Sequence, residues 1–197
     1  KQNSAESAAS SAATTTPQVP APSTPTGVTA TAGANQVALA WNAVSGATSY
    51  KVYRGATLVT TVATTTYTET GLTAGTSVTY TVVASNAGGS SAASSGVSAT
   101  PLPAAPTGLA VTPGNASNAL TWTAVTGAAS YRVYRNGTQV GTPSATSYSD
   151  TGLTNGTSYS YYVVAVAGSA LSVPSSIVSG TPTRPLVNGT FVGNTAS

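Results

Sequence analysis

Apolar and polar residues alternate in short runs along this chain, and residues typical of turns separate the runs. The side chains of Val37, Leu39 and Trp41, for example, fall on one face of such a run. Successive side chains of a β-strand point to opposite sides, so this period of two predicts a strand with one buried face. We interpret Trp41, and Trp122 in a matching run, as core residues and not as platforms for stacking on a sugar.

Seven strands are predicted in the first half of the chain. They are Gly27–Thr31, Gln36–Trp41, Ser49–Arg54, Thr57–Val62, Thr65–Thr70, Ser77–Ser85 and Ser95–Thr100. The second half repeats the scheme, most clearly at Ala119–Trp122, Ser130–Arg135, Ser147–Ser149 and Ser158–Val166. Short strands at this spacing predict an all-β chain of two tandem, seven-stranded antiparallel β-sandwiches.

The two halves are copies of one unit, 81 residues apart, without a net insertion or deletion. Matched pairs include Trp41/Trp122, Tyr50/Tyr131, Tyr53/Tyr134, Tyr67/Tyr148 and Tyr80/Tyr161. A period of this length is that of a small domain and not of a solenoid repeat. We therefore expect two domains, residues 22–101 (module 1) and 102–182 (module 2). A Ser/Thr/Ala/Pro-rich arm, 1–21, precedes them, and a C-terminal tail, 183–197, follows.

Proline residues stiffen the connection between the modules. Pro101, Pro103 and Pro106 fall within six residues, and such a segment favours polyproline II, which rises about 3.1 Å per residue. We expect a short, semi-rigid link and an elongated pair of modules.

Several motifs recur in the same order in both modules. They are a Pro-Thr-Gly entry, a Trp that closes the second strand, a Tyr-x-Val-Tyr-Arg third strand and a Gly-Leu-Thr-x-Gly-Thr turn. In these motifs the chain resembles the fibronectin type III family, as found in microbial secreted or cell-surface proteins. The resemblance implies an immunoglobulin-like sandwich but says little about function, because this fold serves many roles.

The resemblance also implies a tyrosine six residues after the turn leucine, whose hydroxyl bonds back to the preceding loop. Tyr159 follows Leu153 at this spacing, whereas Val78 stands at the matching place after Leu72. We predict that module 1 lacks this tie and is the less stable copy.

The residues that carry most enzyme chemistry are absent or isolated. The chain has no His and no Cys, and each module holds one carboxylate, Glu69 or Asp150. Glycoside hydrolysis needs two carboxylates within about 5 to 10 Å, and metal sites need several ligands. We therefore expect no catalytic residue, no cofactor and no metal. We interpret Glu69 and Asp150 as surface partners of Arg54 and Arg135, weakly stabilising at best.

Charged residues make up only 5% of the chain, and the net charge is +3. The Lys and Arg residues are scattered, so no nucleic-acid partner is expected. No apolar run approaches the roughly 20 residues of a membrane-spanning helix, so no membrane span is expected either. A polar surface made of Ser and Thr is frequent in exported proteins, and no Met is present. We expect a processed or truncated chain that is extracellular or displayed at the cell surface.

Two groups of residues are candidates for an interaction surface. Tyr53 and Tyr134 fall on the outer face of their strands, beside Arg54 and Arg135. These four residues could contact a glycan or a neighbouring subunit. Packing across strands of a solvated sheet is the alternative.

The second group lies in the C-terminal tail, which carries the apolar residues Leu186, Val187, Phe191 and Val192. Apolar residues in a tail dock against other surfaces. The tail could dock on its own domain or add a strand to a neighbour's sheet edge, and both alternatives stay open.

We predict a non-catalytic extracellular structural protein, a self-associating subunit of a surface filament or matrix. Its contacts would be made through the terminal segments and sheet edges, with other copies, other surface proteins or glycans. Low charge favours this prediction because it removes the repulsion between packed copies. The alternative is a spacer, or a weakly glycan-binding region, of a larger secreted carbohydrate-active enzyme or adhesin.

Overall fold

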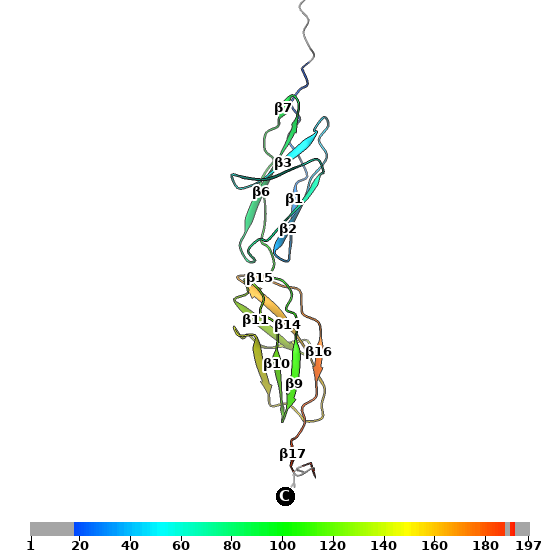
Figure 1. Cartoon of the computed structure of the whole chain (residues 1–197), viewed down its shortest axis with the longest axis vertical. Helices are drawn as coiled ribbons and strands as arrows, with labels where there is room; N and C mark the ends of the chain where they lie inside the picture. Colours follow the sequence, from blue (N-terminus) through cyan, green and yellow to red (C-terminus); the bar gives the residue numbers. More distant parts are fainter. Residues whose placement is uncertain (1–17, 188–189, 192–197) are drawn as a thin grey trace, which may run out of the picture.

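The structure is a computed structural model, and it describes residues 18–187 and 190–191. Every regular secondary-structure element in this part of the chain is a β-strand. They form two β-sandwiches that follow one another along the chain, and Figure 1 shows them end to end. The predicted fold class is confirmed, and each sandwich has one short strand more than the seven predicted.

Module 1 consists of two antiparallel sheets. Its strands are β1 (Thr29–Gly33), β2 (Gln36–Ala40), β3 (Ser49–Arg54), β4 (Thr57–Val62), β5 (Thr66–Thr70), β6 (Val78–Asn86), β7 (Gly89–Ser90) and β8 (Val97–Ala99). One sheet has the order β1-β2-β5, and the other has β4-β3-β6, with both β7 and β8 paired to β6.

Module 2 has the same topology. Its strands are β9 (Ala110–Gly114), β10 (Ser117–Thr121), β11 (Ser130–Arg135), β12 (Thr138–Gly141), β13 (Ser147–Thr151), β14 (Tyr159–Ala167), β15 (Ala170–Leu171) and β16 (Val178–Gly180). The order β9-β10-β13 forms one sheet, and β12-β11-β14 forms the other, with β15 and β16 on β14.

The core of each module lies between its two sheets and is built around a tryptophan. Trp41 is buried and meets Tyr50 edge to face, with ring centroids 5.5 Å apart. Trp122 and Tyr131 repeat this contact at 5.3 Å. The expectation that both tryptophans are core residues is confirmed, and the inward phase of the alternation explains their place.

The last strand of each module is shorter than the sequence predicts. Instead of a strand over Ser95–Thr100, only Val97–Ala99 is regular. Before it, the hydroxyls of Ser91 and Ser94 each accept a hydrogen bond from a backbone N–H of β6 at 3.0 Å. Serine side chains thus replace part of the backbone ladder, and module 2 repeats the device on β14.

The terminal segments are only partly described. Residues 1–17 and Val192 lie outside the described residues, so the predictions that concern them stay predictions. The end of the arm lies along module 1, where Asn86 Nδ2 donates a hydrogen bond to the carbonyl oxygen of Pro20 at 2.8 Å. In the tail, β17 (Leu186–Val187) pairs with β18 (Thr190–Phe191), in a two-stranded sheet separate from the sandwiches.

Candidate functional site

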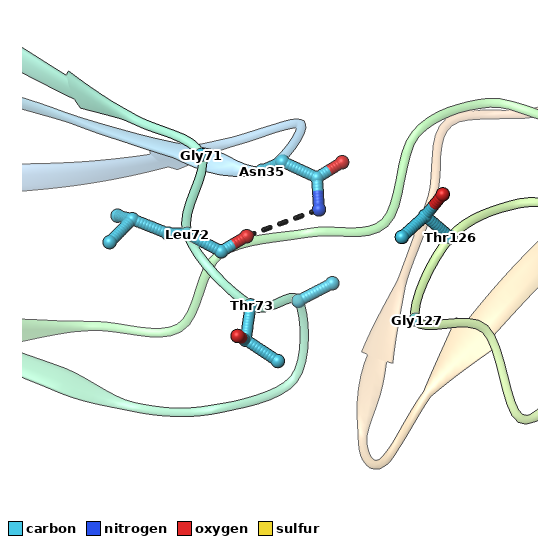
Figure 2. Close-up of a pocket in the computed structure, with 7 residues that line it drawn as sticks. Asn35, Gly71, Leu72, Thr73, Thr126 and Gly127 are labelled. Carbon is cyan, nitrogen blue, oxygen red and sulfur yellow. Dashed lines mark hydrogen bonds between the residues drawn. The ribbon is translucent and has the colours of Figure 1, made fainter.

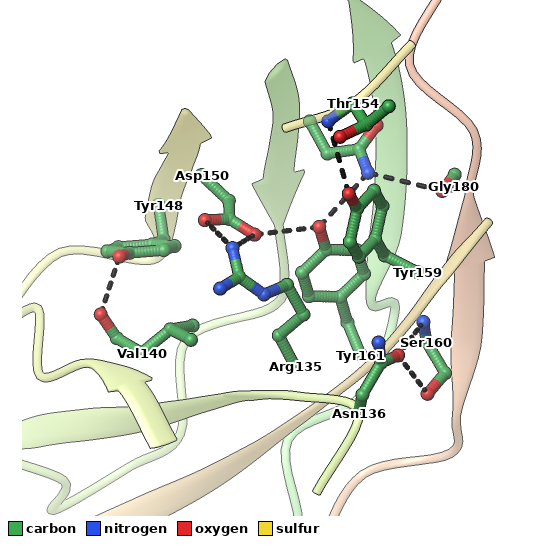
Figure 3. Close-up of polar contacts among 11 residues, drawn as sticks. Arg135, Asn136, Val140, Tyr148, Asp150, Thr154, Tyr159, Ser160, Tyr161 and Gly180 are labelled. Atoms are coloured by element: carbon green, nitrogen blue, oxygen red, sulfur yellow. Dashed lines mark hydrogen bonds and ion pairs between the residues drawn. The ribbon is translucent and has the colours of Figure 1, made fainter. Parts of the chain in front are cut away.

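A chain of polar contacts crosses the interior of module 2 (Figure 3). Arg135 Nη1 lies 2.9 Å from Asp150 Oδ1 and 3.1 Å from Oδ2. The hydroxyl of Tyr161 donates to Asp150 Oδ2 at 2.8 Å and accepts from Asn118 Nδ2 at 3.0 Å. Because these residues come from β10, β11, β13 and β14, the network links the two sheets of the sandwich.

The buried end of this network depends on a glycine. Asn118 is fully buried, and its Nδ2 also donates to the carbonyl oxygen of Gly180 at 3.2 Å. A Cβ at Gly180 would lie 3.0 Å from the Asn118 side chain and 2.4 Å from that of Val111. Module 1 has Val37 and Ala99 at these two places. The buried amide of Asn118 therefore occurs in the module that has a glycine to make room for it.

Module 1 contains a simpler version of the same network. Arg54 Nη1 lies 2.9 Å from Glu69 Oε1, and the Tyr80 hydroxyl donates to Glu69 Oε2 at 2.6 Å.

The interpretation of the two carboxylates as surface groups is wrong, although the predicted pairs with arginine exist. The side chain of Glu69 is 11% exposed and that of Asp150 is 5% exposed. Alternate residues of β5 and β13 point toward the core. Glu69 and Asp150 stand at such positions, so each carboxylate points inward.

Both network tyrosines are weaker acids than usual. Burial is the main cause, and it raises the pKa of Tyr161 to about 12. The donated hydrogen bond from Asn118 lowers this pKa and the carboxylate of Asp150 raises it. Burial and the neighbouring Glu69 carboxylate raise the pKa of Tyr80 well above its ordinary value. Each phenol therefore stays neutral and donates to its carboxylate.

The arrangement joins the sheets, and each carboxylate is already engaged by a cation and a phenol. Within residues 18–187 and 190–191, no group of three or more His, Cys, Asp or Glu residues could hold a metal ion. The same residues include no helix that is long and apolar enough to cross a membrane.

The tyrosine tie distinguishes the two modules. Tyr159 Oη accepts a hydrogen bond from the backbone N–H of Thr154 at 3.1 Å, and the guanidinium of Arg135 lies 5.7 Å from the Tyr159 ring centroid. Val78 at the matching place in module 1 has no hydroxyl. The implied tie is therefore present in module 2, and its effect on stability stays a prediction.

A second candidate site is the joint, which we define as Ala74 and Gly75 of module 1 with Gly127, Ala167 and Gly168 of module 2. An open hollow of about 300 Å³ lies beside it, between the turn at Gly71–Ala74 and the loop at Thr126 and Gly127 (Figure 2). Ala74 is buried at this place and lies against Gly127.

The backbones of the two modules approach closely at the joint. A Cβ at Gly75, whose φ is +77°, would lie 2.5 Å from the carbonyl oxygen of Ala167. The linker is fixed as well, because Leu102 N donates to Gly33 O at 2.9 Å and Asn35 N donates to Leu102 O at 2.8 Å. The joint is thus held by close packing and by hydrogen bonds.

Residues 104–181 match the family model for the fibronectin type III domain. Module 1 has the same strand order and repeats the same motifs. The chain is a tandem of two fibronectin type III domains.

A solved structure agrees with this assignment. The two-domain fibronectin type III segment of chicken tenascin superposes with a TM-score of 0.58 at 22% identity, over 81% of this chain and 98% of that one. At this identity the likeness shows the fold.

Relatives with higher identity are larger proteins that match the chain over part of their own length. Exoglucanase B of Cellulomonas fimi is 43% identical over 188 residues, which are 82% of this chain and 17% of the relative. Chitinase A1 of Niallia circulans is 42% identical over 195 residues, 86% of this chain and 27% of the relative. The poly(3-hydroxybutyrate) depolymerase of Ralstonia pickettii is 54% identical over 79 residues, 39% of this chain and 16% of the relative. The matched residues make up less than a third of each relative.

The structure places the predicted interaction residues in different surroundings. Tyr53 and Tyr134 lie on outward positions of their strands, but Arg54 and Arg135 turn to the buried carboxylates. The ring of Tyr134 stacks on that of Tyr162, with centroids 4.6 Å apart and planes at 11°.

Sequence reasoning missed Tyr162 and the joint. The signal for Tyr162 was its difference from Thr81, at the same place in the other fibronectin type III domain. No single sequence motif indicated the joint, because its residues come from both modules. The tail residues Leu186, Val187 and Phe191 lie on a hairpin of their own, which is not part of the sheets that carry these tyrosines.

Proposed function

We propose that the chain is a non-catalytic, extracellular spacer within a larger polymer-degrading enzyme. The observation that supports it is the joint, which fixes one fibronectin type III domain against the next. A spacer of this kind holds the parts on either side at a set distance, because the linker is bonded to module 1 and the turn at Gly75 of module 1 packs against Ala167 of module 2.

The joint differs from the outer ends of the two modules in a consistent way. Ala74 and Ala167 are buried within it. Their counterparts at the outer ends are Asn155 and Asn86. Asn155 Oδ1 accepts from Ala116 N at 2.8 Å, and Asn86 bonds to Pro20. The sequence thus supplies apolar residues for one internal contact and polar ones for the ends.

This pattern favours a spacer over a filament subunit. Stacking of further copies through the same contact would bring Asn155 of one copy and Asn86 of the next into one joint, in the places of Ala74 and Ala167, and burial of an unpaired amide is unfavourable. The predicted filament gains no support from the relatives either. Their names, an exoglucanase, a chitinase and a depolymerase, support the spacer and an extracellular place.

The test compares two glycine substitutions in the whole chain placed between two fluorescent proteins. Gly75→Ala puts a Cβ into the joint, whereas Gly156→Ala puts one into open space at the free end of module 2. Both glycines have a positive φ, +77° and +82°, so the backbone strain is matched. The energy transfer between the two fluorophores reports the distance across the spacer and its spread.

We expect Gly75→Ala to broaden the distance distribution, and Gly156→Ala to leave it as in the unchanged chain. Equal broadening in both variants, or in neither, would contradict a fixed joint. Release of soluble product from cellulose, chitin or poly(3-hydroxybutyrate) by the chain alone would overturn the non-catalytic assignment.

A further inference from the structure

One sheet of module 2 differs from its counterpart in module 1 on the side that faces outward. At four outward positions of this sheet and its edge, the residues of module 2 are larger and more apolar than those of module 1, and a fifth position carries tyrosine in both modules. We call these residues of module 2 the apolar face: Tyr134, Tyr162, Val166, Leu171 and Ile177. Their counterparts in module 1 are Tyr53, Thr81, Ser85, Ser90 and Gly96.

The members of the apolar face are neighbours across strands. Tyr134 pairs with Tyr162 on the adjacent strand, and Val166 pairs with Leu171. A Cβ at Gly96 would lie 4.0 Å from the methyl group of Thr81. Ile177 and Tyr162, which stand at these two places in module 2, are therefore side by side. The substitutions gather on one surface.

This surface holds more exposed apolar area than the fold requires. Ile177 is 68% exposed, and Val173 on the same edge is 64% exposed. Module 1 has Gly96 and Ala92 at these places and the same strand order. Contiguous apolar residues at the surface mark interaction sites, whereas single ones are ordinary.

We propose that the apolar face docks on the surface of a solid, uncharged aliphatic polyester. This inference rests on the proposed function and names the polymer class for it. Arg132 is the one charged residue at the outward positions of β11, β12 and β14–β16, all of which are described. The aliphatic side chains match an aliphatic chain, and the arginine can donate hydrogen bonds to a polymer whose polar groups are ester carbonyls.

The geometry disfavours a polysaccharide on this face. Stacking on a sugar needs an accessible aromatic ring face, and the contact between Tyr134 and Tyr162, with centroids 4.6 Å apart, covers one face of each ring. Among the relatives, the poly(3-hydroxybutyrate) depolymerase has the highest identity reported above, 54%. Its substrate, by its name, is an aliphatic polyester.

The size of the apolar face also disfavours a second copy of this chain. The five strands of this sheet hold 24 residues in all, and at about 3.3 Å per residue and 4.8 Å between strands they give roughly 400 Å² in projection. A stable protein–protein interface buries about 800 Å² on each partner. A solid surface makes no such demand, because a flanking domain of the enzyme can hold the spacer near it.

The test measures depletion of the whole chain from solution by poly(3-hydroxybutyrate), chitin and cellulose particles. In the triple variant Tyr162→Thr, Val166→Ser and Leu171→Ser, each residue becomes the one that module 1 carries at the same place. The matched control is the double variant Ser85→Val and Ser90→Leu in module 1. Thermal melting confirms that each variant is folded.

We expect the unchanged chain to bind the polyester, the triple variant to bind at least tenfold more weakly, and the control to bind at least as tightly. Equal binding by the unchanged chain and the folded triple variant would overturn the proposal, as would no binding at all. Binding to chitin or cellulose that the triple variant loses would replace the polyester by a polysaccharide. A dimer that the triple variant abolishes would replace it by a second copy.

These outcomes are separate from the test of the joint. A chain that binds none of the three polymers but keeps the Gly75→Ala effect remains a spacer without a docking face. A chain that binds the polyester but shows no effect of Gly75→Ala has the face without the fixed joint.

Discussion

At the scale of single residues, the two modules show alternative solutions to one problem, which is how to bury a carboxylate. Module 1 uses Glu69 with Arg54 and Tyr80, and module 2 uses the shorter Asp150. The shorter side chain brings in Asn118, whose amide hydrogen-bonds to the same phenol. A buried charge is unfavourable unless it is paired and hydrogen-bonded, so the members of each network depend on one another.

Asp150→Asn should destabilise module 2 by about 2 to 3 kcal/mol, because it leaves Arg135 without its anion and weakens the bond to Tyr161. Chemical unfolding of the whole chain measures the change. Ser176→Asn, at an exposed position, is the control and should change the stability little. A change below about 0.5 kcal/mol for Asp150→Asn would show that the pair contributes no more than a surface salt bridge.

The network tyrosines make the fold sensitive to alkaline pH. The pKa of Tyr161 is raised to about 12 in the folded chain, from an unfolded value of about 10. The unfolded state therefore loses this proton first, and the stability present below pH 10 is lost as pH rises from about 10 to about 12. Tyr161→Phe should flatten this part of the profile. A profile that is level over this range in the unchanged chain would contradict the shift.

At the scale of elements, the alternation of apolar residues identified most strands, and the errors lie where side chains replace the backbone. The bounds Ser49–Arg54 and Thr57–Val62 agree with the structure. The last strand is short because the hydroxyls of Ser91 and Ser94 make its hydrogen bonds. A periodic pattern reports which face is buried, but it does not report which atom makes a bond.

The loop before β14 is fixed by Tyr159, and this loop should separate the stabilities of the two modules. Tyr159→Val removes the hydrogen bond to Thr154 and the contact with Arg135, so module 2 should lose about 1 kcal/mol. Calorimetry of the whole chain should show its melting temperature fall.

Val78→Tyr is the reciprocal change, because it introduces the hydroxyl into module 1. We expect it to raise the melting temperature of module 1. A decrease in both variants would show that the tie depends on other residues of module 2.

At the scale of the whole molecule, the joint is the feature that turns two domains into one long body. Figure 1 shows the modules end to end, and the contact between them is made by small residues. Gly75 lies so close to the carbonyl of Ala167 that no side chain fits. Proline residues in the linker predicted stiffness, but the bonds from Leu102 to Gly33 and Asn35 supply it here.

The sequence by itself determined the duplicated sandwich, the tryptophan cores and the shortage of reactive side chains. These properties follow from local alternation, from a fixed repeat and from the inventory of residues. Only the tertiary structure decided that Asp150 is buried, that Tyr134 stacks on Tyr162 and that Gly75 meets Ala167. Each of these depends on strand register or on contact between segments far apart in the chain, and neither is encoded in the pattern of a single strand.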